Sequence, residues 1–460
     1  METGETIAQE KLEPKPQESP QPPPAADRDD SHTLNSSSRD GQVVRIEPDL
    51  DFIRSLSREV GETFKMCIQC GTCSATCLNS PDPEPFPRKE MIWASWGMKD
   101  RLISDPDVWL CYQCNDCSTR CPRGARPGDV LAAMRRETVQ HYAIPRFFAK
   151  WVNQPQCIPL LLGIPVALLS LALVLKAPIE RFLGLAGGDV SERIVYPYSS
   201  VFPHWLLNSF FFFFTSLVIV ALVFGVRRFW RGMLSTLPPE RARAPARGMA
   251  ASIATALKSV ITHEKFSTCT RARTRRWAHL CVFFGFLALT MVTTWVITAR
   301  INPLIQEEFI YPFGFWNPWK ILANAGGIAI LAGCALIIKD RLTEDEQAGS
   351  GTYFDWALIV TLLSVVLTGF VTEVLHYVRL EPHRHLAYFV HLVFVFTLLM
   401  YLPYSKFAHM IYRTTALVFA ERTGRSGVTE LETKTGPAAI FAQPQPAVGA
   451  TSVTPDSMER

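Results

Sequence analysis

The sequence predicts a mainly α protein, in which a helical domain with two cysteine runs is followed by a multi-span bundle of transmembrane helices. Three observations predict this class. Eight of the twelve cysteines form two matching runs between residues 67 and 121. Six apolar stretches between residues 158 and 412 each approach the length that a helix needs to cross a bilayer. The segments that flank the cysteines place apolar residues at helical intervals.

The cysteine runs form a motif with a specific chemistry. Each reads C-x2-C-x2-C-x3-C, and the second ends in Cys121-Pro122. Closely spaced thiolates surround three corners of an iron–sulfur cube, and in two-cluster ferredoxins the fourth cysteine of each run ligates the other cluster. We therefore expect a helical two-cluster ferredoxin domain with two [4Fe–4S] clusters. The predicted ligand sets are Cys67, Cys70, Cys73 with Cys121, and Cys111, Cys114, Cys117 with Cys77.

Zinc and disulfides are the other uses of closely spaced cysteines. Zinc takes four ligands per ion, usually from C-x2-C pairs, and gives no reason for three thiolates followed by a fourth. A membrane-anchored zinc-binding interaction module without a redox role is nevertheless the alternative from another class of function. Disulfides need an oxidising compartment, and the remaining four cysteines are scattered without a pairing pattern.

Composition divides the chain into four parts. Residues 1–42 are polar and rich in proline, and residues 416–460 are again polar, so both segments predict disordered tails. Residues 43–145 form the predicted cluster domain and residues 155–415 the membrane domain. The first 45 residues contain no apolar core, so we expect no signal peptide.

The membrane domain is predicted to cross the lipid bilayer about six times. The first stretch contains Pro159 and Pro165, which membrane helices tolerate. The predicted spans are Ile158–Leu175, Trp205–Val226, Trp277–Thr298, Ile321–Ile338, Tyr353–Val378 and Leu386–Tyr412.

Charge predicts the orientation in the membrane. The connection from Arg227 to Arg276 contains twelve lysines and arginines against two glutamates, which the positive-inside rule places in the cytoplasm. Both termini and the cluster domain are then cytoplasmic, where thiolates stay reduced, and the protein is a multi-pass protein of the inner membrane. The basic connection lacks the interleaved aromatic residues of a nucleic-acid site, so we expect no nucleic-acid partner.

Histidines in the apolar stretches are candidate haem b ligands, because ionisable residues inside spans are usually functional. His391 and His409 are 18 residues apart, which is five turns and about 27 Å on one continuous helix. That spacing predicts one imidazole near each membrane face. His279 at the cytoplasmic end of its span is the expected partner of His409 on an inner haem.

The second ligand of an outer haem is less constrained. His376 at the end of the fifth span is the simplest partner for His391, and His383 or His385 in the next turn are substitutes. One or two haems b are therefore expected. His263 follows an amphipathic stretch in the basic connection and is interpreted as part of an interfacial helix.

Two segments of the chain resemble known families. The cysteine segment 67–121, with its helical insert, resembles the small iron–sulfur subunit of heterodisulfide reductases. Residues 205–412, with His391-Leu392-Val393 and His409, resemble the cytochrome b subunit of those enzymes and the nitrate reductase gamma subunit. The fused order is similar to the C subunit of quinone-interacting membrane-bound oxidoreductase (Qmo) complexes. This resemblance implies cytoplasmic flavoprotein and iron–sulfur partner subunits, and adenylylsulfate reductase of dissimilatory sulfur metabolism beyond them.

The function predicted is electron transfer between the quinone pool and the clusters. Quinol or quinone is the expected membrane substrate, with Glu373 and Lys406 as candidate binding residues because they are charges beside candidate haem ligands. Glu373 is placed to relay a proton, whereas Lys406 also fits a helix-end charge that reaches the interface. A membrane electron-donor subunit of a heterodisulfide reductase-like complex shares every site residue and is the alternative within the same class.

Overall fold

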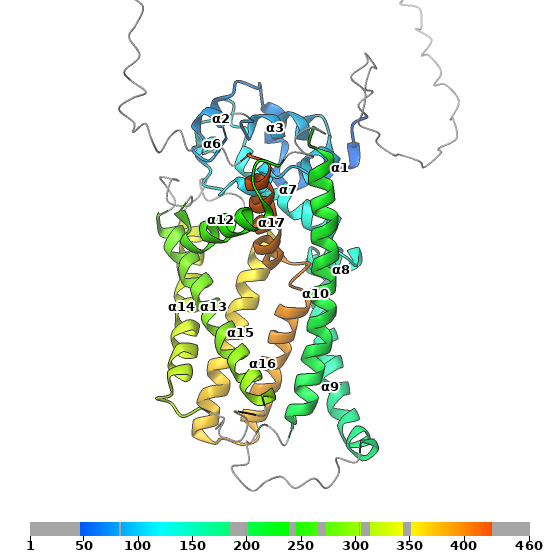
Figure 1. Ribbon diagram of the computed structural model, residues 1–460, viewed down its shortest axis with the longest axis vertical. Coiled ribbons are helices and arrows are strands. Elements are labelled where there is room, and N and C mark those ends of the chain that lie inside the picture. The colour runs from blue at the N-terminus through cyan, green and yellow to red at the C-terminus, as the bar shows by residue number, and fades with distance from the viewer. Residues whose placement is uncertain are drawn as a thin grey trace, which may run out of the picture. The chain divides into compact units, whose positions relative to one another are not determined.

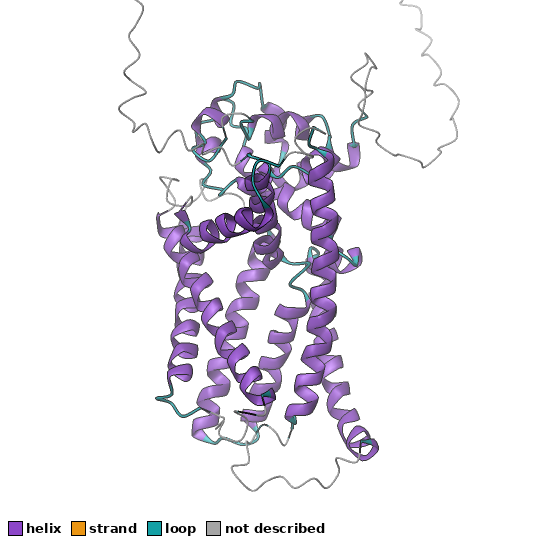
Figure 2. Cartoon of the chain, in the orientation of Figure 1, coloured by secondary structure: helices purple, strands orange, loops and turns teal. Residues whose placement is uncertain are grey.

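A computed structural model provides the three-dimensional structure. It describes residues 47–81, 84–183, 198, 201–238, 245–264, 273–302, 304, 313–343 and 351–425. The predicted tail at 1–42 lies outside these residues, as does 426–460 of the other tail. Within the described residues every regular element is a helix, as Figure 2 shows, which confirms the mainly α prediction.

The cysteine-containing part is built from short helices. Asp49 caps the start of helix α1, and its carboxylate accepts a hydrogen bond from the Phe52 N–H at 2.8 Å. Helix α7 begins with Pro127, a residue suited to the first helical turn. Trp109 and Phe64 are among the side chains fully buried between these helices. The helices are α1 (Leu50–Val60), α2 (Thr72–Thr76), α3 (Arg88–Ser95), α4 (Lys99–Ile103), α5 (Asp107–Leu110), α6 (Asp116–Thr119) and α7 (Pro127–Tyr142).

Six of the described helices are long and apolar enough to cross a membrane, and they run lengthwise beside one another in Figure 1. Phe212 and Phe213 remain half exposed on their surface, as lipid-facing side chains do. The helices are α9 (Ile158–Phe182), α10 (His204–Ser235), α13 (Arg273–Ile301), α14 (Pro318–Thr343), α15 (Tyr353–Val378) and α16 (His383–Met400).

Glycines allow α13 and α14 to pack closely. A Cβ atom on Gly285 would lie 2.6 Å from the carbonyl oxygen of Gly326, and one on Gly333 would lie 2.7 Å from that of Ala278. Small residues at such contacts let two membrane helices approach at backbone distance. His279 lies on α13, so this packing fixes the helix that carries it.

The last predicted span is wrong in one respect: it is two helices. Helix α16 ends at Met400, and a short 3₁₀ turn at Lys406–Ala408 precedes α17 (His409–Arg422). Pro403 lies in the break. It explains the interruption, because proline removes a helical N–H and clashes with the preceding turn. His391 and His409 therefore do not share one continuous helix, and the 27 Å spacing does not apply.

Helix α17 also extends beyond the predicted start of the tail at residue 416. Leu417 and Phe419 are buried, and Tyr412 stacks on Trp109 of the cysteine-containing part with ring centroids 5.7 Å apart. α12 (Met249–Thr262), an amphipathic helix within the basic connection, packs beside α17. α17 therefore joins the cysteine-containing helices to the membrane helices.

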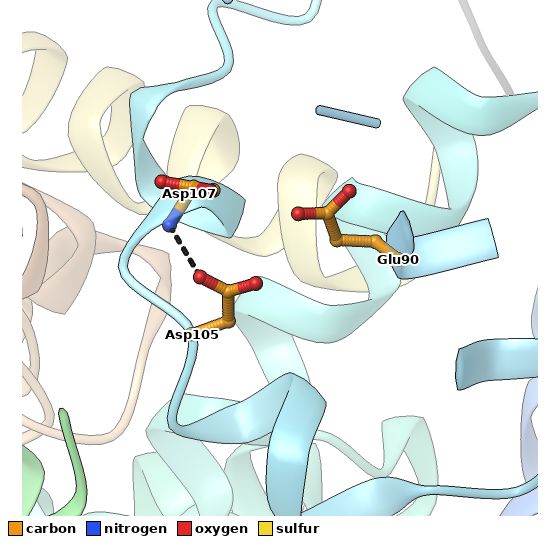
Figure 3. Close-up of side chains that lie close together, drawn as sticks. All are labelled: Glu90, Asp105 and Asp107. Atoms are coloured by element: carbon orange, nitrogen blue, oxygen red, sulfur yellow. Dashed lines mark hydrogen bonds between the residues drawn. The ribbon is translucent and has the colours of Figure 1, made fainter. Parts of the chain in front are cut away.

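A buried acidic cluster lies at this junction (Figure 3). Glu90 and Asp107 are fully buried, and Asp105 is nearly so. Arg425, just after α17, donates two hydrogen bonds of 2.9 Å to the Asp107 carboxylate, and Lys89 Nζ lies 2.5 Å from it. The buried Arg425 and the partly buried Lys89 thus balance most of the negative charge.

Candidate functional site

The two cysteine runs fold into loops with the same backbone conformation. Gln69 and Gln113 stand at equivalent positions with φ of 58° and 53°, a region that non-glycine residues rarely adopt. Gly71 and Asn115 follow at equivalent positions, also left-handed, and begin the short helices α2 and α6. Rare conformations that recur in both loops are typical of functional segments held by their surroundings.

The structure brings the cysteines together in the two predicted sets. Cys67, Cys70, Cys73 and Cys121 line one small hollow. Cys77 instead lies close enough to Cys111 and Cys114 to interact with them electrostatically, and all three interact with Cys117 in the same way. The last cysteine of each run thus crosses to the other set. Ligation of iron by these sets stays a prediction.

The sulfur atoms of the described cysteines are not gathered as closely as the four ligands of one zinc ion. Zinc–sulfur bonds of about 2.3 Å in a tetrahedron place sulfur atoms roughly 3.8 Å apart. Among the described residues, Glu90, Asp105 and Asp107 are the set whose ligand atoms all lie within 4.8 Å of one another, and no three cysteines meet this limit.

Burial favours the protonated form of three of these thiols. Removal from water raises the pKa of the Cys77 thiol to about 12 and that of Cys73 to about 11. Burial also raises the pKa of Cys117. Thiols with such pKa values are protonated at neutral pH, so bound cations are needed to displace their protons.

A large cavity joins the second cysteine loop to the membrane helices. Its volume is about 880 Å³, within the range of roughly 300–1,000 Å³ that ligand pockets span. Cys114 lines it on one side, and His279 of α13 and His409 of α17 line it on others. The predicted inner pair of histidines therefore faces one space, although His409 begins α17 instead of ending a sixth span.

Each of these two imidazoles has its Nδ1 atom engaged. His409 Nδ1 lies 2.5 Å from the Lys406 carbonyl oxygen. His279 Nδ1 lies 3.0 Å from Nε2 of His263. A partner at Nδ1 fixes the ring orientation and makes Nε2 the atom that faces a metal.

His263 is the residue whose role the sequence analysis missed. It is buried, adopts φ of 51° at the end of α12, and lines the same cavity as His279. The interfacial interpretation correctly predicted the amphipathic helix but not that its last residue turns inward. No local pattern in the sequence relates His263 to His279, because they lie on different helices.

The other two candidate haem ligands are at different heights along the bundle. His391 lies on α16 and contacts the middle of α15, whereas His376 lies near the end of α15. His391 Nδ1 is 3.1 Å from Thr368 Oγ1, and a Cβ atom on Gly369 would lie 3.2 Å from its ring. His376 is seven residues further along α15, about 10.5 Å, and its ring lies near Tyr198. The described contacts do not bring His391 and His376 together. An outer haem between them stays a prediction.

The two candidate quinone residues are both ion-paired. Glu373 lies 2.9 Å from Lys320 Nζ and accepts a hydrogen bond of 3.1 Å from the Asn324 side chain. Lys406 pairs with Asp355, and Arg341 lies 3.5 Å from the same carboxylate. Lys406 lines the large cavity beside His409, whereas Glu373 lies on α15 three residues before His376.

Comparisons with known proteins identify both parts of the chain. Residues 63–125 match the 4Fe-4S dicluster domain, which supports iron–sulfur clusters at the cysteine loops. Residues 157–427, more than half of the chain, match the family described as Citrate utilization protein B. The chain belongs to the Citrate utilization protein B family.

A relative within this family is Citrate utilization protein B of Escherichia coli, which is 29% identical over 78% of this chain and 90% of its own length. The segment before the membrane domain is similar to other proteins. The C subunit of the H₂:CoB–CoM heterodisulfide,ferredoxin reductase of Methanothermobacter marburgensis is 34% identical over 22% of this chain. A protein of Archaeoglobus profundus, described as similar to the C subunit of heterodisulfide reductase, is 36% identical over 20%.

The matches span 59% and 50% of the lengths of these two archaeal proteins. No solved structure matches the chain. The predicted resemblance to heterodisulfide reductase iron–sulfur subunits is confirmed, and here such a domain is fused to the Citrate utilization protein B domain. The resemblances to the nitrate reductase gamma subunit and to the Qmo complex stay predictions.

Proposed function

We propose that this protein is a membrane electron-transfer subunit that connects the quinone pool, through haem b and two [4Fe–4S] clusters, to a redox partner on the cytoplasmic side. One observation carries the proposal: His279 and His409 line the same cavity as Cys114. Haem and iron–sulfur clusters supply one-electron transfer when they are bound. The chain supplies the ligands and places the two sites next to each other.

The residues of the cavity fit a haem. Two imidazoles face it with Nδ1 already engaged, which suits axial ligation through Nε2. Val282, Phe283 and Leu362 give it apolar walls. Arginine side chains in the lining suit the acidic groups of a haem. Tyr112, Gln113 and Cys114 of the second cysteine loop also line it, so the second cysteine set is the one next to the histidines.

Contacts from the histidine-bearing helices hold this loop in place. Arg413 of α17 donates a hydrogen bond of 3.0 Å to the Cys111 carbonyl, and its guanidinium lies 3.9 Å from the Tyr112 ring centroid. Arg275 of α13 donates to the Gln113 carbonyl at 2.6 Å. The same two helices therefore position His409, His279 and the loop, which is what a fixed electron-transfer distance requires.

The relatives bear on the partner. Those matched by the cluster domain are named as subunits of heterodisulfide,ferredoxin reductases, which favours cytoplasmic flavoprotein and iron–sulfur partner subunits. The relative matched over most of the chain is named for citrate utilization, which favours a redox enzyme of citrate utilization as a second candidate partner. Adenylylsulfate reductase as partner rests on the Qmo resemblance alone.

The membrane domain is proposed to exchange electrons with quinone. The positive charge of the basic connection favours an inner-membrane protein whose cluster domain faces the cytoplasm. Quinone is the substrate proposed there, with Glu373 and Lys406 as candidate residues. Because both are ion-paired, a quinone at either would bind beside a charge pair and not at an isolated charge. His391 with His376 remains the proposed outer haem pair.

Composition of the purified full-length protein tests the proposal. It should contain about eight non-haem irons with matching sulfide, and dithionite should produce b-type absorption bands. A colourless protein with about two zinc ions would support the interaction-module alternative. Iron without haem would leave a cluster protein and exclude the role of His279 and His409.

A further inference from the structure

The cavity beside His279 and His409 has an excess of positive charge. Among the described residues that line it, five are lysine or arginine and two are aspartate. Lys406 forms an ion pair with Asp355. The four arginines lie on four different helices, α7, α13, α14 and α17. Such an excess inside a partly apolar cavity is unfavourable without bound anions. The cavity-lining arginines considered below are Arg135, Arg341 and Arg413.

Each of these three arginines has buried N–H groups without a protein acceptor in the part of the chain that the structure describes. They are Nε and Nη2 of Arg135, Nη1 of Arg341 and Nη2 of Arg413. Arg413 Nη1 is already bonded to the Cys111 carbonyl, and Arg341 Nη2 lies 3.5 Å from Asp355. Buried donors without acceptors are rare and costly, so these groups point to a missing acceptor.

We propose that the cavity binds a carboxylate-bearing ligand whose carboxylates are held by Arg135, Arg341 and Arg413. The planar guanidinium pairs with a carboxylate through two parallel hydrogen bonds, which matches more than one unbonded nitrogen on a single side chain. The identity of the ligand rests on the proposed function: with haem at His279 and His409, the carboxylates are the two propionates. A free tricarboxylate is the other source of the same chemistry.

Arg135 also contacts the second cysteine set, as Arg413 does at the Cys111 carbonyl. The Cys111 thiol, a member of the second cysteine set, interacts with its guanidinium. One positive charge therefore lies between the second set and the cavity. A positive charge stabilises a centre when it gains an electron, so Arg135 is a positioning residue that raises the reduction potential on both sides.

Ligand binding to haem-free full-length protein in detergent tests the proposal. The protein is produced without haem precursor and titrated with haem, with haem dimethyl ester, whose propionates are uncharged, and with citrate as the free anion. Soret absorbance reports the two haems, and tryptophan fluorescence reports citrate because Trp230 lines the cavity. The variants are Arg135→Gln, Arg341→Gln and Arg413→Gln, with Arg58→Gln, an exposed arginine on α1, as the matched control.

The expected result is that wild-type protein prefers haem to its dimethyl ester by roughly ten- to a hundred-fold, the size of a lost charge-assisted hydrogen bond. Each cavity variant reduces this preference, and Arg58→Gln leaves it unchanged. If the protein does not prefer haem to the ester but binds citrate, and the same variants abolish citrate binding, the three arginines (the arginine clamp) hold a free tricarboxylate. Equal binding of haem and ester together with no citrate binding overturns the proposal.

These outcomes separate the clamp from the proposed function. If haem binds through the histidines but its ester binds equally well, the clamp is wrong and the proposed function stands. If no haem binds, the proposed function fails and the citrate titration still decides the clamp. Redox titration of the holoprotein adds a readout that folding alone does not move. Arg135→Gln should lower the potentials of both the haem and the second cluster, whereas Arg341→Gln should lower that of the haem alone.

Discussion

Nε2 of His263 lies 3.0 Å from Nδ1 of His279, which joins the end of α12 to the first turns of α13. An imidazole that ligates a metal usually has such a partner on its other nitrogen, because the partner fixes both tautomer and orientation. The bond also gives the amphipathic helix α12 a direct connection to the candidate haem cavity.

His263→Ala should weaken haem binding by roughly ten- to a hundred-fold while leaving the haem ligands in place. The reason is that the ring of His279 loses the group that orients it. Haem titration of the purified variant measures this effect. His263→Gln should restore part of it because the amide also hydrogen-bonds, and His141→Ala, on α7 and outside the residues that line the cavity, is the control. Unchanged haem affinity in His263→Ala would show that the contact is only packing.

The crossing of the fourth cysteines predicts which substitutions act together. Cys121→Ser and Cys70→Ser should alter the same cluster signal in electron paramagnetic resonance spectra, because these residues line one hollow. Cys77→Ser and Cys114→Ser should alter the other signal. Cys157→Ser, outside both sets, should alter neither. If Cys77→Ser instead groups with Cys70→Ser, each run binds its own cluster and the assignment is wrong.

Glu90 predicts a pH dependence of stability. Burial raises the pKa of its carboxyl well above the usual range, and the nearby Asp105 raises it further. The folded state therefore holds a proton that the unfolded state releases at lower pH, so stability falls as pH rises above about 4.5. Glu90→Gln removes this titration. The thermal midpoint of Glu90→Gln minus that of wild type should increase from pH 5 to pH 8. A difference between the two midpoints that stays constant with pH would contradict a protonated Glu90.

Arg425 should stabilise the junction between α17 and the cysteine-containing helices. Arg425→Gln leaves the fully buried Asp107 with Lys89 as its remaining described cation, so we expect a loss of about 3 kcal/mol in the free energy of unfolding. Thermal unfolding in detergent measures the loss. The exposed pair of Arg54 with Asp51 is the control, and Arg54→Gln should cost less than about 1 kcal/mol. Equal effects of the two substitutions would refute the role of the buried pair.

Local patterns predicted much of this structure. The repeated cysteine spacing fixes which three thiols share a loop, and the two-cluster ferredoxin pattern predicted that the fourth cysteine of each run lies with the other set. Runs of apolar residues predicted the membrane helices because a bilayer imposes their length. The same logic failed at Pro403, where an apolar run was interpreted as one helix although proline interrupts it.

The rest of the site depends on contacts between distant segments. His263 reaches His279 only because α12 folds back beside α17 and α13. Arg135, on a helix of the cysteine-containing part, lines the cavity only because that part docks on α17. Neither residue belongs to a motif. Their roles follow from tertiary packing, which spacing along the chain does not report.

Oxidation of the reduced clusters by quinone tests the central claim most directly. Full-length protein reduced with dithionite is mixed with a soluble quinone, and the cluster signals are followed by freeze-quench electron paramagnetic resonance. The account predicts rapid loss of the reduced signals in wild type. In His409→Ala we expect loss of the inner haem's absorption, retention of about eight irons, and cluster oxidation slowed at least roughly ten-fold. Cluster oxidation at the wild-type rate in that variant would contradict the account, because electrons would then bypass the histidine cavity.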